Sequence, residues 1–142
     1  MQIIKKGHIY KYVIVPVSEV DAIWDNIKHE VARTNDKVFN DEDVKLFINE
    51  GIYTLWLIIE NKTNDIIANF TTEYVFYPRD KICRIVTMSG NRMNDWVNET
   101  LSMIENWAKE QGCSYMDSYG RKGWKKFLKD YSEHSILFRK QL

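Results

Sequence analysis

The stretch KICRIVTMSGNRMNDWVNETLSMIENWAKEQGCSYMDSYGRKGW, residues 81–124, determines the fold class. Ile82–Met88 is rich in branched and apolar residues, which is typical of a strand buried on both faces. After a short polar break, Met93–Ala108 carries apolar residues at helical spacing, and Gly112 supplies a stop for that helix. Cys113–Tyr119 then predicts another strand. A strand, a helix and a strand within about forty residues predict a crossover between two parallel strands.

The sequence on both sides of this unit predicts further strands and helices. Strands are expected at Tyr10–Val17, Ile52–Glu60, Ile66–Tyr77 and Ser135–Leu142, and helices at Ser18–Val31, Asp41–Ile48 and Gly120–Tyr131. Ser18 and Asp41 are expected to cap the first two helices. Residues 1–142 therefore form one α/β (α+β) domain with a mixed sheet. In it, an antiparallel meander is followed by the strand-helix-strand crossover and a C-terminal helix and strand.

Composition excludes several classes of function. Hydrophobic residues make up 44% of the chain and aromatic residues 13%, so a large aromatic core is expected. Basic and acidic residues balance at 20 each, and no nucleic-acid partner is expected, because nonspecific binding needs surplus positive charge. No apolar run is long enough for a signal peptide or a membrane span, which predicts a cytoplasmic protein without a membrane partner. The three histidines are scattered, so no metal site is expected.

Several short pieces of the chain together carry a family resemblance. They are Leu55-Trp56, Tyr77-Pro78-Arg79, Cys83-Arg84-Ile85-Val86, Gly90, the stretch Ile104–Cys113, and Gly120-Arg121-Lys122-Gly123-Trp124. With the order of elements, they resemble the GNAT superfamily of N-acetyltransferases, and more specifically a small phage-encoded branch with a degenerate acetyl-CoA loop. The resemblance implies acetyl-CoA as cofactor, held between two splayed parallel strands, here Ile82–Met88 and Cys113–Tyr119. It implies an amine substrate without naming one.

The resemblance also assigns the cofactor-binding residues. They are Val86, Thr87, Met88, Ser89, Gly90, Asn91, Arg92, Met93 and Asn94. The backbone N–H groups of Gly90–Asn94, at a helix N-terminus, would hold the pyrophosphate. A backbone N–H near Val86–Met88, made available by a break in strand pairing, would donate to the thioester carbonyl. Gly90→Asp is accordingly expected to abolish cofactor binding with only a mild effect on folding.

Two side chains are candidates for proton transfer. The resemblance implies that Glu73 deprotonates the amine, whereas the alternative is a solvent-facing residue on a half-buried strand. Tyr131 would protonate the leaving thiolate, or it would only close the last helix as an aromatic cap. A basic face on the last helix would bind the 3′-phosphate of the coenzyme, an acidic partner, or nothing. Its members are Arg121, Lys122, Lys125, Lys126 and Lys129.

A noncatalytic role is the alternative function. The loop Ser89–Asp95 carries a single glycine, and Ser132-Glu133 replaces a glycine pair of the family. The rival is therefore a phage protein that keeps the fold as a scaffold, either a virion component or an inhibitor of a host protein. Its location would be the host cytoplasm or the virion. A protein partner would be supported by one exposed aromatic patch, for which the candidates are Tyr10, Tyr12, Trp24 and Trp56. The oligomeric state stays open.

Overall fold

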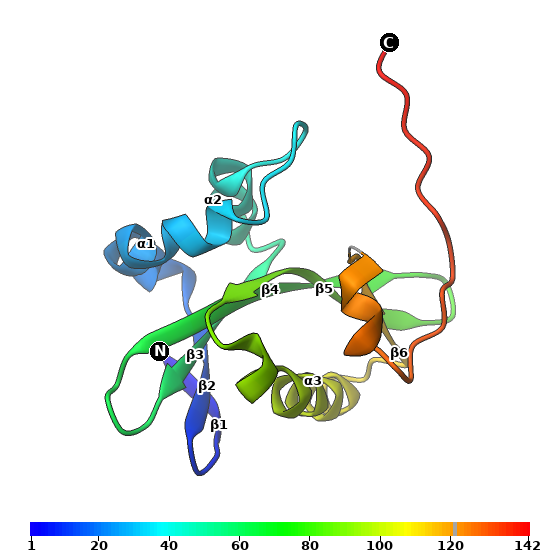
Figure 1. Cartoon of the computed structure of the whole chain (residues 1–142). Helices are drawn as coiled ribbons and strands as arrows, with labels where there is room; N and C mark the ends of the chain where they lie inside the picture. Colours follow the sequence, from blue (N-terminus) through cyan, green and yellow to red (C-terminus); the bar gives the residue numbers. More distant parts are fainter. Residues whose placement is uncertain (121) are drawn as a thin grey trace.

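The computed structural model describes residues 1–120 and 122–142, and Arg121 of the expected basic face lies outside the described residues. The strands are β1 (Gln2–Lys6), β2 (Tyr10–Val15), β3 (Thr54–Glu60), β4 (Ile66–Phe76), β5 (Lys81–Gly90) and β6 (Tyr115–Ser118). The helices are α1 (Val17–Ala32), α2 (Asp41–Asn49) and α3 (Met93–Glu110), followed by a short 3₁₀ helix η1 (Lys122–Lys126). Helices α1 and α2 cover one face of the sheet, and α3 covers the other (Figure 1).

The six strands form one mixed sheet in the order β1-β2-β3-β4-β5-β6. Strands β1 to β5 are antiparallel neighbours, and β6 is parallel to β5. The mixed sheet, its meander and its crossover through α3 confirm the predicted fold class. None of the helices within the described residues is long and apolar enough to cross a membrane.

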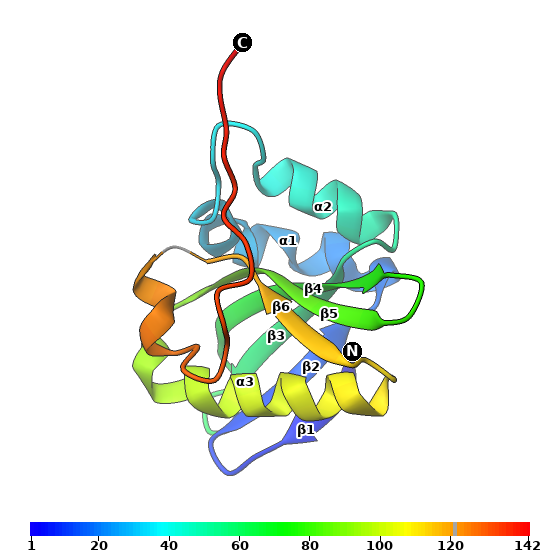
Figure 2. The ribbon, with the colours of Figure 1, turned by 90° about the vertical axis from the view of Figure 1, so that its right-hand side faces the viewer.

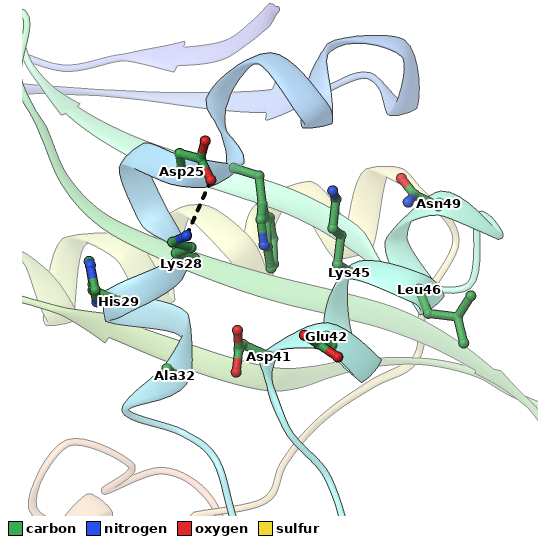
Figure 3. A pocket seen from close by; sticks show the side chains of 10 residues that line it. Asp25, Lys28, His29, Ala32, Asp41, Glu42, Lys45, Leu46 and Asn49 are labelled. Carbon is green, nitrogen blue, oxygen red and sulfur yellow. Dashed lines mark ion pairs between the residues drawn. The ribbon is translucent and has the colours of Figure 1, made fainter.

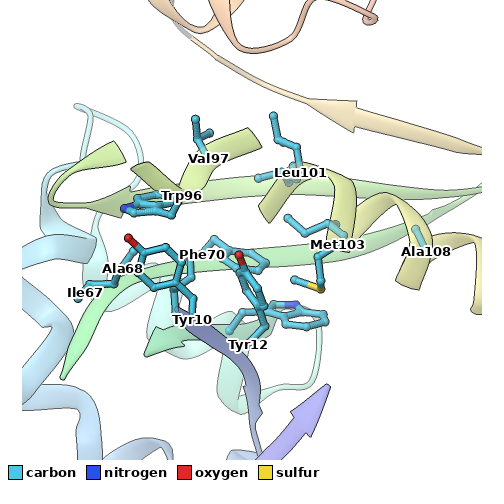
Figure 4. Close-up of a cluster of buried hydrophobic side chains, with 14 of the residues drawn as sticks. Tyr10, Tyr12, Ile67, Ala68, Phe70, Trp96, Val97, Leu101, Met103 and Ala108 are labelled. Atoms are coloured by element: carbon cyan, nitrogen blue, oxygen red, sulfur yellow. The ribbon is translucent and has the colours of Figure 1, made fainter. Parts of the chain in front are cut away.

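Alternating side chains on the strands build a separate core on each face of the sheet. On β2, Tyr12 points to the α3 face and Val13 to the α1–α2 face; on β3, Trp56 and Leu57 divide in the same way. The α3-face core includes Tyr12, Trp56, Phe70, Cys83, Ile85, Trp96, Val97, Leu101 and Ile104 (Figure 4). The α1–α2-face core includes Val13, Leu55, Leu57, Val20, Trp24, Ile27, Val31, Val44 and Ile48.

Aromatic packing dominates the core on the α3 face. The Trp56 ring stacks on Phe70 with centroids 5.3 Å apart and meets Trp107 edge-on at 4.8 Å. The Trp56 indole N–H donates to Thr72 Oγ1 at 3.1 Å, so the polar end of this fully buried ring is satisfied. Tyr10, Tyr12, Trp24 and Trp56, the candidates for an exposed aromatic patch, form none, because all four side chains are buried in the two cores.

The ends of the first two helices differ from the sequence expectation. Helix α1 begins at Val17 with extended Pro16 at its N-cap and no side-chain capping bond, so Ser18 lies inside the first turn. Helix α2 is capped by Asn40, whose side chain accepts from the backbone N–H of Asp43 while the Asp43 carboxylate accepts from the Asn40 N–H. The predicted cap Ser18 therefore lies two residues after the observed N-cap of α1, and the predicted cap Asp41 lies one residue after that of α2.

The C-terminal part departs most from the sequence pattern. The last predicted helix is reduced to η1, and no strand forms over Ser135–Leu142. Ile136, Leu137 and Phe138 are 72–88% exposed, and the segment runs past β6 toward the α1–α2 loop (Figure 2). Alternation of apolar and polar residues indicates a local preference for a strand, but a strand also needs a partner with free backbone groups in register. Here the chain leaves the sheet after Ser118 and residues 135–142 pair with no strand, so the predicted final strand is wrong.

Candidate functional site

The candidate site is an opening between the two parallel strands. Strand β6 pairs with β5 only from Ile82↔Tyr115 to Ile85↔Ser118, whereas β5 continues to Gly90. Beyond Ile85, this edge of β5 has no strand partner among residues 1–120 and 122–142. The splayed strands that the resemblance implied are not seen as such: all four residues of β6 pair with β5, and the two strands part because β6 ends at Ser118. The second strand is shorter than expected at its two ends.

A β-bulge lies where the two strands part. Thr71 faces Thr87 and Thr72 faces Ile85, so Val86 between them has no partner on β4. A bulge disrupts the local ladder and bends the strand, which leaves backbone groups without strand partners. The break in pairing expected near Val86–Met88 therefore lies at Val86 itself.

The loop before α3 is shorter than the sequence pattern indicates. Ser89 and Gly90 still belong to β5, and the Ser89 hydroxyl donates to Glu30 of α1 at 3.1 Å. The connection is Asn91-Arg92, in which Arg92 adopts the left-handed conformation with φ 55°. Helix α3 starts directly afterwards, so the backbone N–H groups of Met93 and Asn94 lie in its first turn, at the positive end of the helix dipole.

Gly90 has a packing role that the sequence did not reveal. A Cβ atom on Gly90 would lie 2.4 Å from the Cβ of Ala68 and 2.6 Å from the carbonyl oxygen of Ile67, both on β4. The glycine thus allows the end of β5 to approach β4. The expectation that Gly90→Asp affects folding only mildly is wrong, because the obstructing atoms are backbone and a short side chain.

Three charged side chains form a row across β4, β5 and β6 beside the opening. Arg84 is the register partner of Glu73 on β4 and of Asp117 on β6. Its Nη1 donates to Glu73 Oε1 at 3.4 Å and its Nη2 to Asp117 Oδ2 at 3.2 Å. Glu73 is therefore half-buried in an ion pair rather than freely solvated.

Two aromatic side chains border this row. The Tyr119 ring centroid lies 4.7 Å from the Arg84 guanidinium carbon, a cation–π distance. Burial raises the pKa of Tyr53 to about 12, and the charges of Glu73 and Arg84 also act on this phenol. Burial lowers the pKa of Arg84, but its hydrogen bond to Asp117 and the negative charges around it outweigh burial, so the pKa is raised overall. Arg84 lies between Cys83 and Ile85, which both belong to the α3-face core, so by alternation along β5 the row lies on the α1–α2 face.

Tyr131 lies on the opposite face of the sheet from Glu73. It follows η1, and burial raises its pKa well above the ordinary value, with further contributions from Glu105 of α3 and Cys83 of β5. Its hydroxyl is buried and has no hydrogen-bond partner among the described residues. The structure therefore does not bring the two candidate catalytic residues together on one face.

Sequence reasoning missed Arg84, Asp117 and Tyr53 as neighbours of Glu73. One signal was available for Arg84, because a charged residue inside an otherwise apolar strand needs a partner. The partners themselves are set by strand register, which cannot be read from the sequence.

The expected basic face of the last helix is reduced, since Lys122, Lys125 and Lys126 are exposed on one short 3₁₀ turn.

A groove of about 660 Å³ lies between α1 and α2 (Figure 3). Charged side chains of both signs line it, and Lys28 pairs with Asp25 along one wall at 3.4 Å. The lining residues are Trp24, Asp25, Lys28, His29, Ala32, Asp41, Glu42, Lys45, Leu46 and Asn49. The groove arises where two helices meet, so no local sequence pattern indicates it.

Comparison with known proteins identifies the fold. No protein-family profile and no curated protein sequence matches the chain. A GNAT family acetyltransferase of Staphylococcus aureus is 17% identical at a TM-score of 0.65, with 94% of this chain and 99% of that chain covered. Glucosamine-6-phosphate N-acetyltransferase from Arabidopsis thaliana is 16% identical at 0.65, with 93% and 97% covered. A predicted acetyltransferase with acetyl-CoA from Clostridium acetobutylicum is 17% identical at 0.66, with 94% and 95% covered.

At these identities the likeness establishes the fold alone, which is that of the GNAT acetyltransferases. The likeness covers almost the whole of each chain.

Proposed function

We propose that the protein binds acetyl-CoA in the opening between β5 and β6 and transfers the acetyl group to an amine. The observation that carries the proposal is the early end of β5–β6 pairing at Ile85↔Ser118, combined with the bulge at Val86. Acetyl-CoA fits this feature, because an extended ligand can bond to strand groups that lack a protein partner. The solved structures of the same fold include one with acetyl-CoA and one with CoA.

The chain supplies a site for each end of the coenzyme. The first N–H groups of α3, from Met93 and Asn94, suit an anionic pyrophosphate at a helix N-terminus. A backbone N–H at the bulge, near Val86, suits the carbonyl oxygen on which negative charge develops. The coenzyme supplies an acyl group activated as a thioester.

Proton transfer is assigned to Glu73 and Tyr131. During transfer the C–N bond of the amide forms, the C–S bond breaks, Glu73 accepts the amine proton, and Tyr131 protonates the departing sulfur. A phenol is protonated at neutral pH, as a general acid requires, and burial raises the pKa of Tyr131 further, which makes it a weaker acid. The two residues lie on opposite faces, so they act together only on a ligand that passes through the opening.

Calorimetric titration with acetyl-CoA, and with desulfo-CoA as a non-reactive control, tests the binding site. We expect micromolar affinity, and an Asn94→Glu variant weakens it at least about tenfold, since a carboxylate beside the pyrophosphate repels it. The matched control is Asn106→Glu, an identical change at another exposed position of α3. No heat with the unmodified protein, and no change in melting temperature at millimolar ligand, would refute the proposal.

The catalytic assignment is tested with Tyr131→Phe. If Tyr131 is the acid, kcat falls about 10²- to 10⁴-fold while coenzyme affinity is kept. Removal of a buried hydroxyl that lacks a partner should at the same time leave the melting temperature unchanged or higher. Unchanged kcat would show that Tyr131 is not the acid and acts only as an aromatic cap.

A noncatalytic role is the second candidate: a phage protein that uses the fold as a virion component or as an inhibitor of a host protein. The observation that favours it is the exposed apolar segment Ile136–Phe138, which packs against neither core. Copurification with and without residues 135–142 tests it. A partner lost on truncation, together with no coenzyme binding, would favour this candidate.

A further inference from the structure

The first turn of α3 lacks the usual side-chain cap. Arg92 occupies the N-cap position, and no side chain within the described residues caps the helix. An arginine side chain can only donate hydrogen bonds, so it cannot accept one from a helix N–H group. The Arg92 carbonyl accepts from the Asp95 N–H at 2.9 Å. The N–H groups of Met93 and Asn94 are left for an acceptor from outside the chain.

The backbone of Arg92 has a conformation that arginine disfavours. Its φ of 55° and ψ of 44° are left-handed, where a Cβ atom is crowded and glycine is not. A residue other than glycine keeps this conformation only where its surroundings hold it. Asn91 and Arg92 alone connect β5 to α3, so the contacts that hold these two residues also set the direction of the first N–H groups of the helix.

Three bonds hold this connection. The Trp96 indole N–H donates to the Asn91 carbonyl oxygen at 2.7 Å, and the Asn91 N–H donates to the Ile67 carbonyl oxygen on β4 at 3.2 Å. The Arg92 Nη2 pairs with Glu60 Oε2 at the end of β3, also at 3.2 Å. The bond from Trp96 has the most rigid base, since this side chain is fully buried in the α3-face core whereas that of Arg92 is 53% exposed.

Trp96 reaches back to the connection because side chains on a helix point toward its N-terminus. Trp96 is the fourth residue of α3, and Asn91 is the residue before the N-cap. In many helices these two positions make an apolar contact that fixes how the chain enters the helix. Here a hydrogen bond, the Trp96 lock, takes the place of that contact and anchors the connection from inside the core.

We infer that Trp96 is a positioning residue for the coenzyme: its indole N–H keeps Arg92 left-handed, and so keeps the N–H groups of Met93 and Asn94 available to the pyrophosphate. This inference rests on the proposed function and adds to it a residue that acts through the backbone of the connection. Neither residue of the connection is glycine. The Trp96 lock therefore supplies what a glycine would supply through its conformational freedom.

The test measures desulfo-CoA affinity by calorimetry in two backgrounds. Trp96→Phe removes the indole N–H and keeps an aromatic ring, so we expect Kd to rise about three- to tenfold, the effect of one lost hydrogen bond. In a chain that carries Arg92→Gly, the same change should alter Kd by less than about twofold, because glycine needs no lock. A role in core packing alone would weaken binding equally in both backgrounds.

Trp107→Phe is the matched control, because it makes an identical change on α3 against the same core. We expect it to lower the melting temperature and to leave Kd within about twofold. If desulfo-CoA binds but Trp96→Phe leaves Kd unchanged, or raises it equally in both backgrounds, the inference is overturned and the proposed function stands.

Amide hydrogen exchange in the absence of coenzyme measures the Trp96 lock directly. Trp96→Phe should accelerate exchange of the Asn91 and Asp95 N–H groups at least about fivefold relative to that of Ile104 in the middle of α3. If the unmodified protein does not bind desulfo-CoA, the proposed function is refuted. Accelerated exchange would then still support the lock, and unchanged exchange would overturn it.

Exchange of the Trp96 indole N–H in the unmodified protein needs no variant, so a Trp96→Phe chain that fails to fold does not block the test. Without coenzyme, this N–H should exchange with deuterium at least about a hundredfold more slowly than that of free tryptophan, because it is already bonded to Asn91. Exchange at the rate of free tryptophan would overturn the inference.

Discussion

Substitution of Gly90 by alanine gives the sharpest test of how β4 and β5 pack. The new Cβ would lie 2.4 Å from the Ala68 Cβ, whereas carbon atoms normally approach to about 3.5–4.0 Å. The strands would have to separate by about 1 Å, because Ile67 and Ala68 present backbone atoms and not a flexible side chain. Overpacking of this kind costs up to about 3 kcal/mol, and the entropic advantage of alanine over glycine returns about 0.5–1.

The net loss is therefore about 2 kcal/mol in the free energy of unfolding. For a domain of this size it lowers the melting temperature by about 6–8 °C. Scanning calorimetry of Gly90→Ala measures it. Gly123→Ala is the matched control, because a Cβ there meets no heavy atom within 4 Å and we expect a change within about 0.5 kcal/mol. An equal or higher melting temperature for Gly90→Ala would refute the close approach of the two strands.

Three further changes test other parts of the fold. Thr72→Val leaves the buried Trp56 indole N–H without an acceptor, so urea denaturation should show a loss of about 1–3 kcal/mol; an unchanged midpoint would contradict that hydrogen bond. Asn40→Ala removes the cap of α2, which should lower stability by about 1 kcal/mol in the same assay. The pKa of Tyr53 is raised from 10 to about 12 by burial, so the unfolded chain releases this proton first and stability falls between pH 10 and pH 12. Tyr53→Phe should reduce that fall, and an identical pH profile for the variant would count against the burial of the phenol.

The sequence predicts the elements whose burial is periodic. The stripe Met93–Ala108 fixes α3 because apolar residues at helical spacing need one partner surface. The apolar run Ile82–Met88 in turn identifies the strand on which the opening is built. By contrast, β1 was missed, because its five residues form an edge strand with four exposed side chains and carry little burial pattern.

The candidate site was predictable only where it depends on backbone. The resemblance implied the break in pairing near Val86–Met88 and the helical spacing indicated the start of α3, whereas Arg84 and Asp117 join Glu73 through strand register. Register depends on bulges and on turn lengths, and a shift of one residue moves a side chain to the other face. Tyr131 illustrates this limit, since its place on the α3 face depends on how the chain turns after η1.

The sheet topology has a consequence for the order of folding. Strands β1 to β5 pair only with their neighbours along the chain, apart from the insertion of α1 and α2 between β2 and β3. Strand β6 is connected to its partner β5 through α3, whereas β3, β4 and β5 are joined by short turns. Because long loops close slowly, we expect the hairpins of β3, β4 and β5 to form before β6 docks. Asp117 would then arrive after Glu73 and Arg84 are already in place, so changes in β6 should accelerate unfolding more than they slow folding.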